Sequence, residues 1–255
     1  MRIALAAAFL FSMATLSVAQ NSAPASAAGA TWDYQGKRGA LAWGKLDPAY
    51  KACSQGHAQS PVDIRGAHLN KALPTLDFHY IATAVRLENN GRTILVHVDP
   101  GSYVVIGGIR YDLIEYDFHH PSETAIHGKL SDMEIHLLHQ SADGKQIVIA
   151  IRLAEDVSAP NAVLAELWPF LPKTAGGSEK VAELVNPGGL LPADRGYWTY
   201  YGSLSTPPCT EGVRWFVFEQ ELGLSRDRLR TFANLYKINT RGLQDPHGRR
   251  IEANE

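Results

Sequence analysis

The chain has 255 residues, of which 45% are hydrophobic and 20% are charged, with 22 Gly, 14 Pro and 2 Cys. This composition is typical of an ordinary globular protein, and it excludes a disordered chain, a collagen-like chain and a disulfide-rich miniprotein. The formal net charge of -2 offers no basic field for nucleic acid, so we expect small-molecule partners and no nucleic-acid partner.

The first nineteen residues have the parts of an export signal. Arg2 supplies a positive charge, residues 3–13 are almost wholly apolar, and the small residues Ser17 and Ala19 precede a plausible cleavage site. This apolar run is too short to cross a bilayer, so we expect no membrane insertion. We predict an exported protein, periplasmic or fully secreted, with three segments: a signal peptide at 1–19, a flexible mature N-terminus at 20–31 and one domain at 32–255.

Export gives the two cysteines, Cys53 and Cys209, a specific meaning. In an oxidising compartment a disulfide persists, so we expect one bridge between them, and two buried thiols are the alternative. A bridge that closes so long a loop would stabilise the fold by about 4–5 kcal/mol on a chain-entropy argument.

Short β-rich runs separated by turn residues recur along the chain. They predict strands at 76–80, 93–98, 103–106, 113–119, 134–139, 146–153 and 213–218. Helices are predicted at 162–171, ended by Pro172, and at 225–236, with Ser225 as N-cap and Leu229, Phe232 and Leu235 on one stripe. The fold class is therefore mainly β, a single domain around an antiparallel or mixed sheet with a few short helices.

The densest polar cluster falls on two of these strands. Strand alternation groups Glu115, Asp117 and His119 on one face, and Glu134, His136 and Leu138 on another. If the strands are neighbours, Asp117, His119 and His136 converge and leave a fourth position open for water, which is typical of a catalytic metal site. A set of hydrogen-bonded histidines in a half-buried sheet is the alternative.

Carboxylates beside these residues favour the metal site. Metal-bound imidazoles usually donate their other N–H to a carboxylate or carbonyl, and Glu115 and Glu134 lie two residues from predicted ligands. Two histidines with one carboxylate also match the facial triad of non-haem iron. The spacing therefore leaves Zn²⁺, Fe²⁺ or another divalent metal open.

Further motifs stand in order along almost the whole predicted domain. They are Trp32-Asp33-Tyr34, Gln59-Ser60-Pro61-Val62-Asp63-Ile64, Asn89-Asn90-Gly91, Phe118-His119, Pro121-Ser122-Glu123, Glu134-Ile135-His136-Leu137-Leu138-His139, Gly202-Ser203-Leu204-Ser205-Thr206-Pro207-Pro208-Cys209 and Asn239-Thr240-Arg241. This set resembles the α-class carbonic anhydrases. The resemblance implies a large twisted, mainly antiparallel sheet, a cleft that reaches a zinc ion, and a lyase that reversibly hydrates carbon dioxide to bicarbonate and a proton.

The resemblance also implies roles for single residues. His119 and His136 match the second and third zinc-binding histidines, and Glu134 matches the carboxylate that orients the third. Glu123 matches the acceptor of a hydrogen bond from a gatekeeping hydroxyl, which falls on Ser205 where the family usually has threonine. The backbone N–H of that residue would help to hold bicarbonate.

Three departures from the family lie at the predicted site. Asp117 replaces the first zinc-binding histidine, Glu115 replaces a glutamine that supports it, and Arg92 replaces the usual histidine proton shuttle. An anionic ligand should make the metal a poorer Lewis acid, so we expect weak hydration at neutral pH. Arg92 does not titrate near neutrality and is not expected to act as a shuttle.

The resemblance places the remaining site residues. The predicted substrate pocket contains Leu138, Ile149, Val213, Leu204, Thr206 and Trp215, and the cysteines match a pair that many exported members join as a disulfide. His97 is either a surface imidazole or a proton relay at the mouth of the cleft, and His139 is expected to be buried and structural.

Three functions follow from these observations. The first is a carbonic anhydrase with an altered metal site, acting as a monomer or dimer. A catalytically inactive binding protein that keeps the scaffold and uses the cleft for a ligand is the second. An iron enzyme built on the two histidines and the carboxylate is the third.

Overall fold

The computed structural model describes residues 31–156 and 161–255. The predicted signal peptide at 1–19 and residues 20–30 of the predicted N-terminal segment lie outside the described residues. Among the helices of the described ranges, none combines the length and the apolar character that a bilayer span requires.

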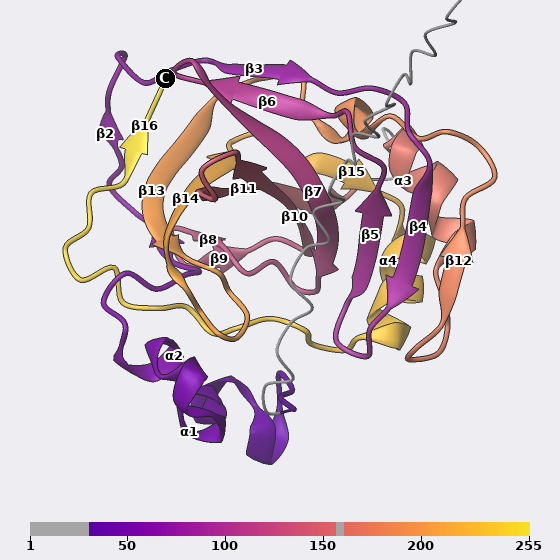
Figure 1. The fold of residues 1–255 in the computed structure, drawn as a ribbon, viewed down its shortest axis with the longest axis horizontal. Coiled ribbons are helices and arrows are strands. Elements are labelled where there is room, and N and C mark those ends of the chain that lie inside the picture. Colours follow the sequence, from indigo (N-terminus) through magenta and orange to yellow (C-terminus); the bar gives the residue numbers. More distant parts are fainter. Residues whose placement is uncertain (1–30, 157–160) are drawn as a thin grey trace, which may run out of the picture.

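A large twisted sheet dominates the described part of the chain (Figure 1). Its strands are β2 (His68–Leu69), β3 (Leu76–His79), β4 (Val85–Asn89), β5 (Ile94–Val98), β6 (Tyr103–Ile106), β7 (Ile109–His119), β10 (Met133–Ser141), β11 (Gln146–Glu155), β12 (Ser178–Lys180), β13 (Tyr197–Ser203), β14 (Glu211–Phe218), β15 (Leu222–Leu224) and β16 (Glu252–Ala253). A small second sheet contains β1 (Asp63–Ile64), β8 (Ala125–Ile126) and β9 (Lys129–Leu130).

The strand order of the large sheet confirms the predicted fold class. Its main path runs β12-β4-β5-β7-β10-β11-β14-β13-β16-β2, with β15 beside β11 and β6 between β3 and β7. Most neighbours are antiparallel, whereas β11 runs parallel to β14 and β15, and β2 runs parallel to β16. The sheet is therefore mixed and mainly antiparallel.

Each predicted strand is present, and several are longer than predicted. β7 begins at Ile109, not at Leu113, because Gly107 and Gly108 form a two-residue turn that pairs Ile106 with Ile109. Both glycines have positive φ, 57° and 82°, as a tight hairpin turn of this kind requires. The Gly-Gly pair was the local signal for this hairpin.

The predicted helices are present but shorter. α3 (Ala162–Leu167) is capped by the Asn161 side chain and continues as a 3-10 turn, whereas α4 (Arg226–Leu235) begins after Ser225. Ser225 occupies the N-cap position, but its hydroxyl makes no capping hydrogen bond to the backbone. The other helical segments are α1 (Trp43–Leu46), α2 (Ala52–Gln55) and 3-10 helices at Gly36–Arg38, Ala40–Ala42, Pro48–Tyr50, Trp168–Phe170 and Pro187–Leu190.

The two faces of the sheet differ in chemistry because side chains alternate along each strand. One face packs into the main core against α3 and α4, where Phe232 of the predicted helical stripe is fully buried and Leu229 and Leu235 pack against it. The opposite face of β5, β7 and β10 carries the polar cluster found in the sequence, in which Glu115 and Asp117 are half-buried and His119, Glu134 and His136 are buried. The core thus fixes the strands that carry the candidate site.

The N-terminal helical segments lie at one end of the sheet (Figure 1). Trp43 of α1 is fully buried there, in a cluster with Cys53 and Cys209. The two cysteines form a disulfide, with their Cα atoms 5.1 Å apart, which confirms the predicted bridge. The bridge ties α2 to the connection between β13 and β14.

Candidate metal centre

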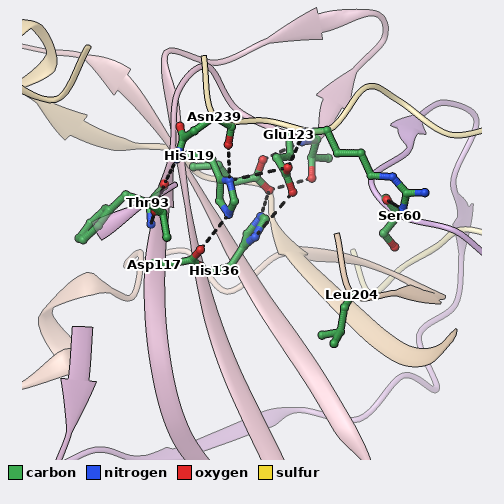
Figure 2. A network of polar contacts seen from close by, with 12 residues as sticks. Ser60, Thr93, Asp117, His119, Glu123, His136, Leu204 and Asn239 are labelled. Carbon is green, nitrogen blue, oxygen red and sulfur yellow. Dashed lines mark hydrogen bonds and ion pairs between the residues drawn. The ribbon is translucent and has the colours of Figure 1, made fainter. Parts of the chain in front are cut away.

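The neighbouring strands β7 and β10 bring the three predicted ligands together (Figure 2). Their register sets His136 directly opposite Asp117 and Glu134 directly opposite His119. One ligand atom from each of Asp117, His119 and His136 can be chosen so that all three lie within 4.8 Å of one another. The convergence expected from strand alternation therefore occurs.

His119 is held in one orientation by a backbone group. Its Nδ1 lies 2.9 Å from the carbonyl oxygen of Asn239, which can only accept, so Nδ1 carries a proton and donates it. In the neutral ring the other nitrogen, Nε2, is then an acceptor, and it faces the Asp117 carboxylate at 3.3 Å. Nε2 of His119 and the Asp117 carboxylate would then be two acceptors that face each other, so a proton or a metal cation must lie between them.

The electrostatics of the cluster favour that positive charge. Burial alone would disfavour a cation, but the carboxylates of Glu123 and Asp117 outweigh it and raise the pKa of His119 to about 10. Burial likewise opposes ionisation of Asp117, but the attraction and hydrogen bonding of His119 keep the pKa of Asp117 below its ordinary value. The donor set of one carboxylate and two imidazoles fits a divalent metal ion such as Zn²⁺ or Fe²⁺.

Glu134 supports His136 from the far side of the ring. It is fully buried, and it accepts hydrogen bonds from the backbone N–H and the hydroxyl of Thr124, each at 2.7 Å. Its Oε1 lies 3.4 Å from Nε2 of His136. Although burial raises its pKa, His136 and Thr124 together lower the pKa of Glu134 to about 2. Thr124 was not predicted, because no pattern in the sequence pairs it with Glu134.

The expected contact between Ser205 and Glu123 does not form. Oε1 of Glu123 accepts a hydrogen bond from the backbone N–H of Arg241 at 2.7 Å, whereas Oε2 is buried and has no hydrogen-bond partner among the described residues. Ser205 lies at the wall of the same cavity. Serine lacks the second Cβ substituent that restricts the threonine rotamer, so its hydroxyl is not fixed toward Glu123.

The three side chains open into a cavity of about 180 Å³. It is lined by Trp32, Tyr34, Asn90, Arg92, Thr93, Leu95, Glu115, Asp117, His119, His136, Leu138, Val148, Leu204, Ser205, Thr206 and Trp215. Leu138, Leu204, Thr206 and Trp215, which were predicted for the substrate pocket, all line this cavity. The cavity therefore has both apolar lining residues, such as Leu138 and Val148, and polar ones, among them the candidate ligands.

Two predicted pocket residues are placed differently. Val148 lies directly opposite Leu138 and lines the cavity, whereas Ile149 points to the other face of the sheet and is buried in the main core. The prediction of Ile149 was wrong by one residue, which in a strand reverses the face. Val213 is not at the cavity wall but packs behind it, in a cluster with Val148 and Trp215.

The two other departures, Glu115 and Arg92, also line the cavity. Burial, with the charges of Asp117 and Glu88, raises the pKa of Glu115 to about 7. The guanidinium of Arg92 lies over the ring of Trp32, 4.5 Å from its centroid, a cation–π arrangement. The described residues show no hydrogen bond between Glu115 and Asp117.

Comparison with known proteins gives one consistent family. The sequence model of the eukaryotic-type carbonic anhydrases matches residues 38–255. A carbonic anhydrase of a Nostoc species is 34% identical over 233 residues, covering 89% of this chain and 88% of its own. A carbonic anhydrase of Klebsiella pneumoniae is 37% identical over 221 residues, covering 86% of this chain and 89% of its own.

Solved structures agree with these sequences. The α-carbonic anhydrase of Thermovibrio ammonificans, in complex with the inhibitor sulfanilamide, has a TM-score of 0.85 at 35% identity and covers 88% of this chain and 99% of its own. A dioscorin complexed with ascorbate has a TM-score of 0.82 at 28% identity and covers 88% of this chain and 97% of its own.

Proposed function

The chain belongs to the eukaryotic-type carbonic anhydrase family, and we propose that it hydrates carbon dioxide to bicarbonate with a divalent cation held by Asp117, His119 and His136. One observation carries the proposal: these three side chains converge, with ligand atoms within 4.8 Å, at the wall of a small cavity. Carbon dioxide and bicarbonate are the substrate pair of this family.

A bound divalent cation supplies Lewis acidity, which lowers the pKa of water and makes a nucleophile available near neutral pH. The carboxylate of Asp117 neutralises part of the charge of the cation, whereas a neutral imidazole at the same position would leave that charge intact. We therefore expect this site to activate water less strongly than a site with three neutral ligands, and we expect hydration at neutral pH to be weak.

The other residues of the cavity orient the ligand side chains, offer an apolar surface to carbon dioxide and donate hydrogen bonds to the reacting oxygen. Asn239 and Glu134 fix the rings of His119 and His136 so that each presents one nitrogen to the cluster. Leu138 and Val148 form an apolar floor that suits carbon dioxide. Ser205 provides a hydroxyl and a backbone N–H at the wall, where a developing oxyanion needs a donor.

The unpartnered Oε2 of Glu123 supports a role for Ser205. A buried carboxylate oxygen without a donor is costly, and it lies 3.9 Å from Nδ1 of His136, next to the candidate ligands. When the Ser205 hydroxyl turns toward Glu123, its proton is held there and its oxygen lone pairs face the substrate.

We propose zinc as the metal, because the cleft around the ligands is that of a zinc-enzyme family, with iron as the alternative that the donor set also accepts. We also propose export to the periplasm. The disulfide between Cys53 and Cys209 supports this address, because such bonds persist in oxidising compartments.

A second candidate function is a ligand-binding protein without hydration activity. The structural likeness to a dioscorin that was solved with ascorbate favours it, because the same scaffold there holds a small organic molecule. Metal analysis with thermal unfolding in added zinc separates the two functions. A hydratase should gain thermal stability with zinc, whereas a metal-independent binding protein should not.

A further inference from the structure

Two rows of side chains cross the cleft face of the sheet, from β4 to β10. The register gives one row as Glu88, Leu95, Asp117 and His136, and the next row as Arg86, His97, Glu115 and Leu138. His97 is thus directly opposite Glu115, which lines the cavity. It is a diagonal neighbour of Asp117, at a Cα separation of about 7–8 Å for such pairs.

Glu88 fixes the orientation of the His97 ring. Nε2 of His97 lies 3.0 Å from Oε2 of Glu88, and the same oxygen accepts a hydrogen bond from Arg86 at 2.9 Å. These hydrogen bonds from Arg86 and His97 lower the pKa of Glu88, so the carboxylate is ionised near neutral pH and can only accept. Nε2 of His97 therefore carries the proton and donates it.

This orientation leaves the other ring nitrogen as the basic atom. Nδ1 of the neutral His97 ring is an acceptor, and within residues 31–156 and 161–255 no hydrogen bond to it is present. The side chain is 33% exposed, and it lies directly opposite Glu115, which lines the cavity. Such a ring can take a proton on one side and release it on the other.

The reaction needs such a group. Each hydration of carbon dioxide releases one proton, and Arg92, at the cavity wall, stays cationic and cannot accept it. The stacking of Arg92 on Trp32 also fixes that side chain in place. The proton must therefore leave the cavity by another route.

We propose that His97 is the proton-relay residue of this enzyme, an inference that rests on the proposed hydratase function. The proton lost by the attacking water passes through intervening water to Nδ1 of His97, while Nε2–H stays bonded to Glu88. The imidazolium then loses the Nδ1 proton to a buffer base, which restores the neutral ring. Only N–H and O–H bonds form and break, and no oxidant or reductant is needed.

Charged groups surround His97 on two strands. Glu88 and Arg86 on β4 and Glu115 on β7 are the charged groups that face the ring. A histidine of similar surroundings outside the cleft is His79, whose Nε2 lies 3.0 Å from Oδ2 of Asp77.

The test compares His97→Gln with His79→Gln in the full zinc-loaded chain. Glutamine keeps an N–H donor for Glu88, so the local hydrogen bond survives. In weak buffer, kcat of His97→Gln should fall about tenfold or more, and added imidazole should restore it. Because the proton leaves after carbon dioxide has reacted, kcat/KM should not change. His79→Gln should match the wild type.

Several results would overturn the relay. The relay is wrong if His97→Gln keeps the wild-type kcat in weak buffer. It is also wrong if imidazole does not restore a lost kcat, or if His79→Gln loses as much kcat as His97→Gln. Nitrogen-15 spectra of the wild-type histidine rings give a readout independent of activity, and a neutral His97 with its proton on Nδ1 would also contradict it. If the wild type itself lacks metal-dependent activity, the hydratase proposal fails first and the relay fails with it.

Discussion

Oδ2 of Asp117 faces Nε2 of His119 at 3.3 Å, while the opposite nitrogen of that ring donates to the carbonyl of Asn239. Once its Nε2 proton is displaced by a cation, a histidine fixed in this way offers a lone pair to the space that it shares with the carboxylate. Asp117 and His119 are therefore placed to bind a cation together. Unlike two neutral imidazoles, they bring one negative charge to it. The charge of Asp117 sets the chemistry that we expect of this site.

Restoring the family residues at positions 117 and 115 should raise the hydration activity. The double variant Asp117→His with Glu115→Gln removes two carboxylates next to the cation and should raise the hydration rate at neutral pH about tenfold, because a less neutralised metal is a stronger Lewis acid. Stopped-flow hydration assays measure the rate. Asp112→Asn, on the same strand but outside the cavity, is the control, and a double variant no faster than the wild type would refute the charge argument.

Glu134→Gln should weaken metal binding. Its ionised carboxylate lies 3.4 Å from Nε2 of His136, and losing such a partner typically costs about 10–100-fold in metal affinity. Competition with a chelator measures the affinity. Glu166→Gln, at an exposed position of α3, should leave the affinity unchanged, and equal affinity in both variants would exclude this role for Glu134.

Two substitutions of Ser205 should act in opposite directions. Ser205→Ala removes the hydroxyl and should lower kcat/KM about 100-fold or more. Ser205→Thr adds a methyl group that restricts the rotamer, so the hydroxyl should stay toward Glu123 and kcat/KM should rise. A threonine variant as slow as the alanine variant would show that the hydroxyl is not used.

His139 should make stability depend on pH. It is fully buried between the Tyr80 hydroxyl, at 2.6 Å, and the Leu137 carbonyl, at 3.0 Å. Burial lowers its pKa from 6.5 to about 3, although the bond to Leu137 opposes this. The unfolded chain thus binds a proton that the folded chain does not, so stability is full above pH 6.5 and is lost as pH falls toward about 3.

His139→Gln removes this titration and should flatten the dependence. Each unit of pKa difference is worth about 1.4 kcal/mol, so between pH 6.5 and about 3 the unfolding free energy of the variant should change less than that of the wild type. Urea unfolding at a series of pH values measures it. His79→Gln is the exposed control, and identical slopes in all three proteins would disprove the assignment.

Loss of the disulfide should destabilise the fold. Cys53 and Cys209 are 156 residues apart in sequence, so the bridge greatly restricts the unfolded chain. The double variant Cys53→Ser with Cys209→Ser should lose about 2–5 kcal/mol of unfolding free energy. Calorimetry under oxidising conditions measures the loss, and a variant as stable as the wild type would show that the bridge does not stabilise the domain.

Strand periodicity made much of the site predictable. Alternation along β7 placed Glu115, Asp117 and His119 on one face, and the structure opens all three to the cavity. Ile149 was placed by the family resemblance and not by this rule, and an offset of one residue in a strand reverses the face. Pairing with Leu138 identifies Val148 instead.

Contacts between distant segments were not predictable in this way. Asn239 reaches His119 through its carbonyl oxygen, and Thr124 reaches Glu134 through its N–H and hydroxyl. These depend on how loops pack onto the strands, for which sequence periodicity carries no signal. The pairing of Glu88 with His97 also required the register between β4 and β5.

The most direct measurement is the carbon dioxide hydration rate of the zinc-loaded protein from about pH 6 to about pH 10, against a metal-stripped control. We expect metal-dependent activity that is weak at neutral pH and rises in alkali, because Asp117 reduces the Lewis acidity of the site. Activity no higher than that of the stripped control at every pH would contradict it.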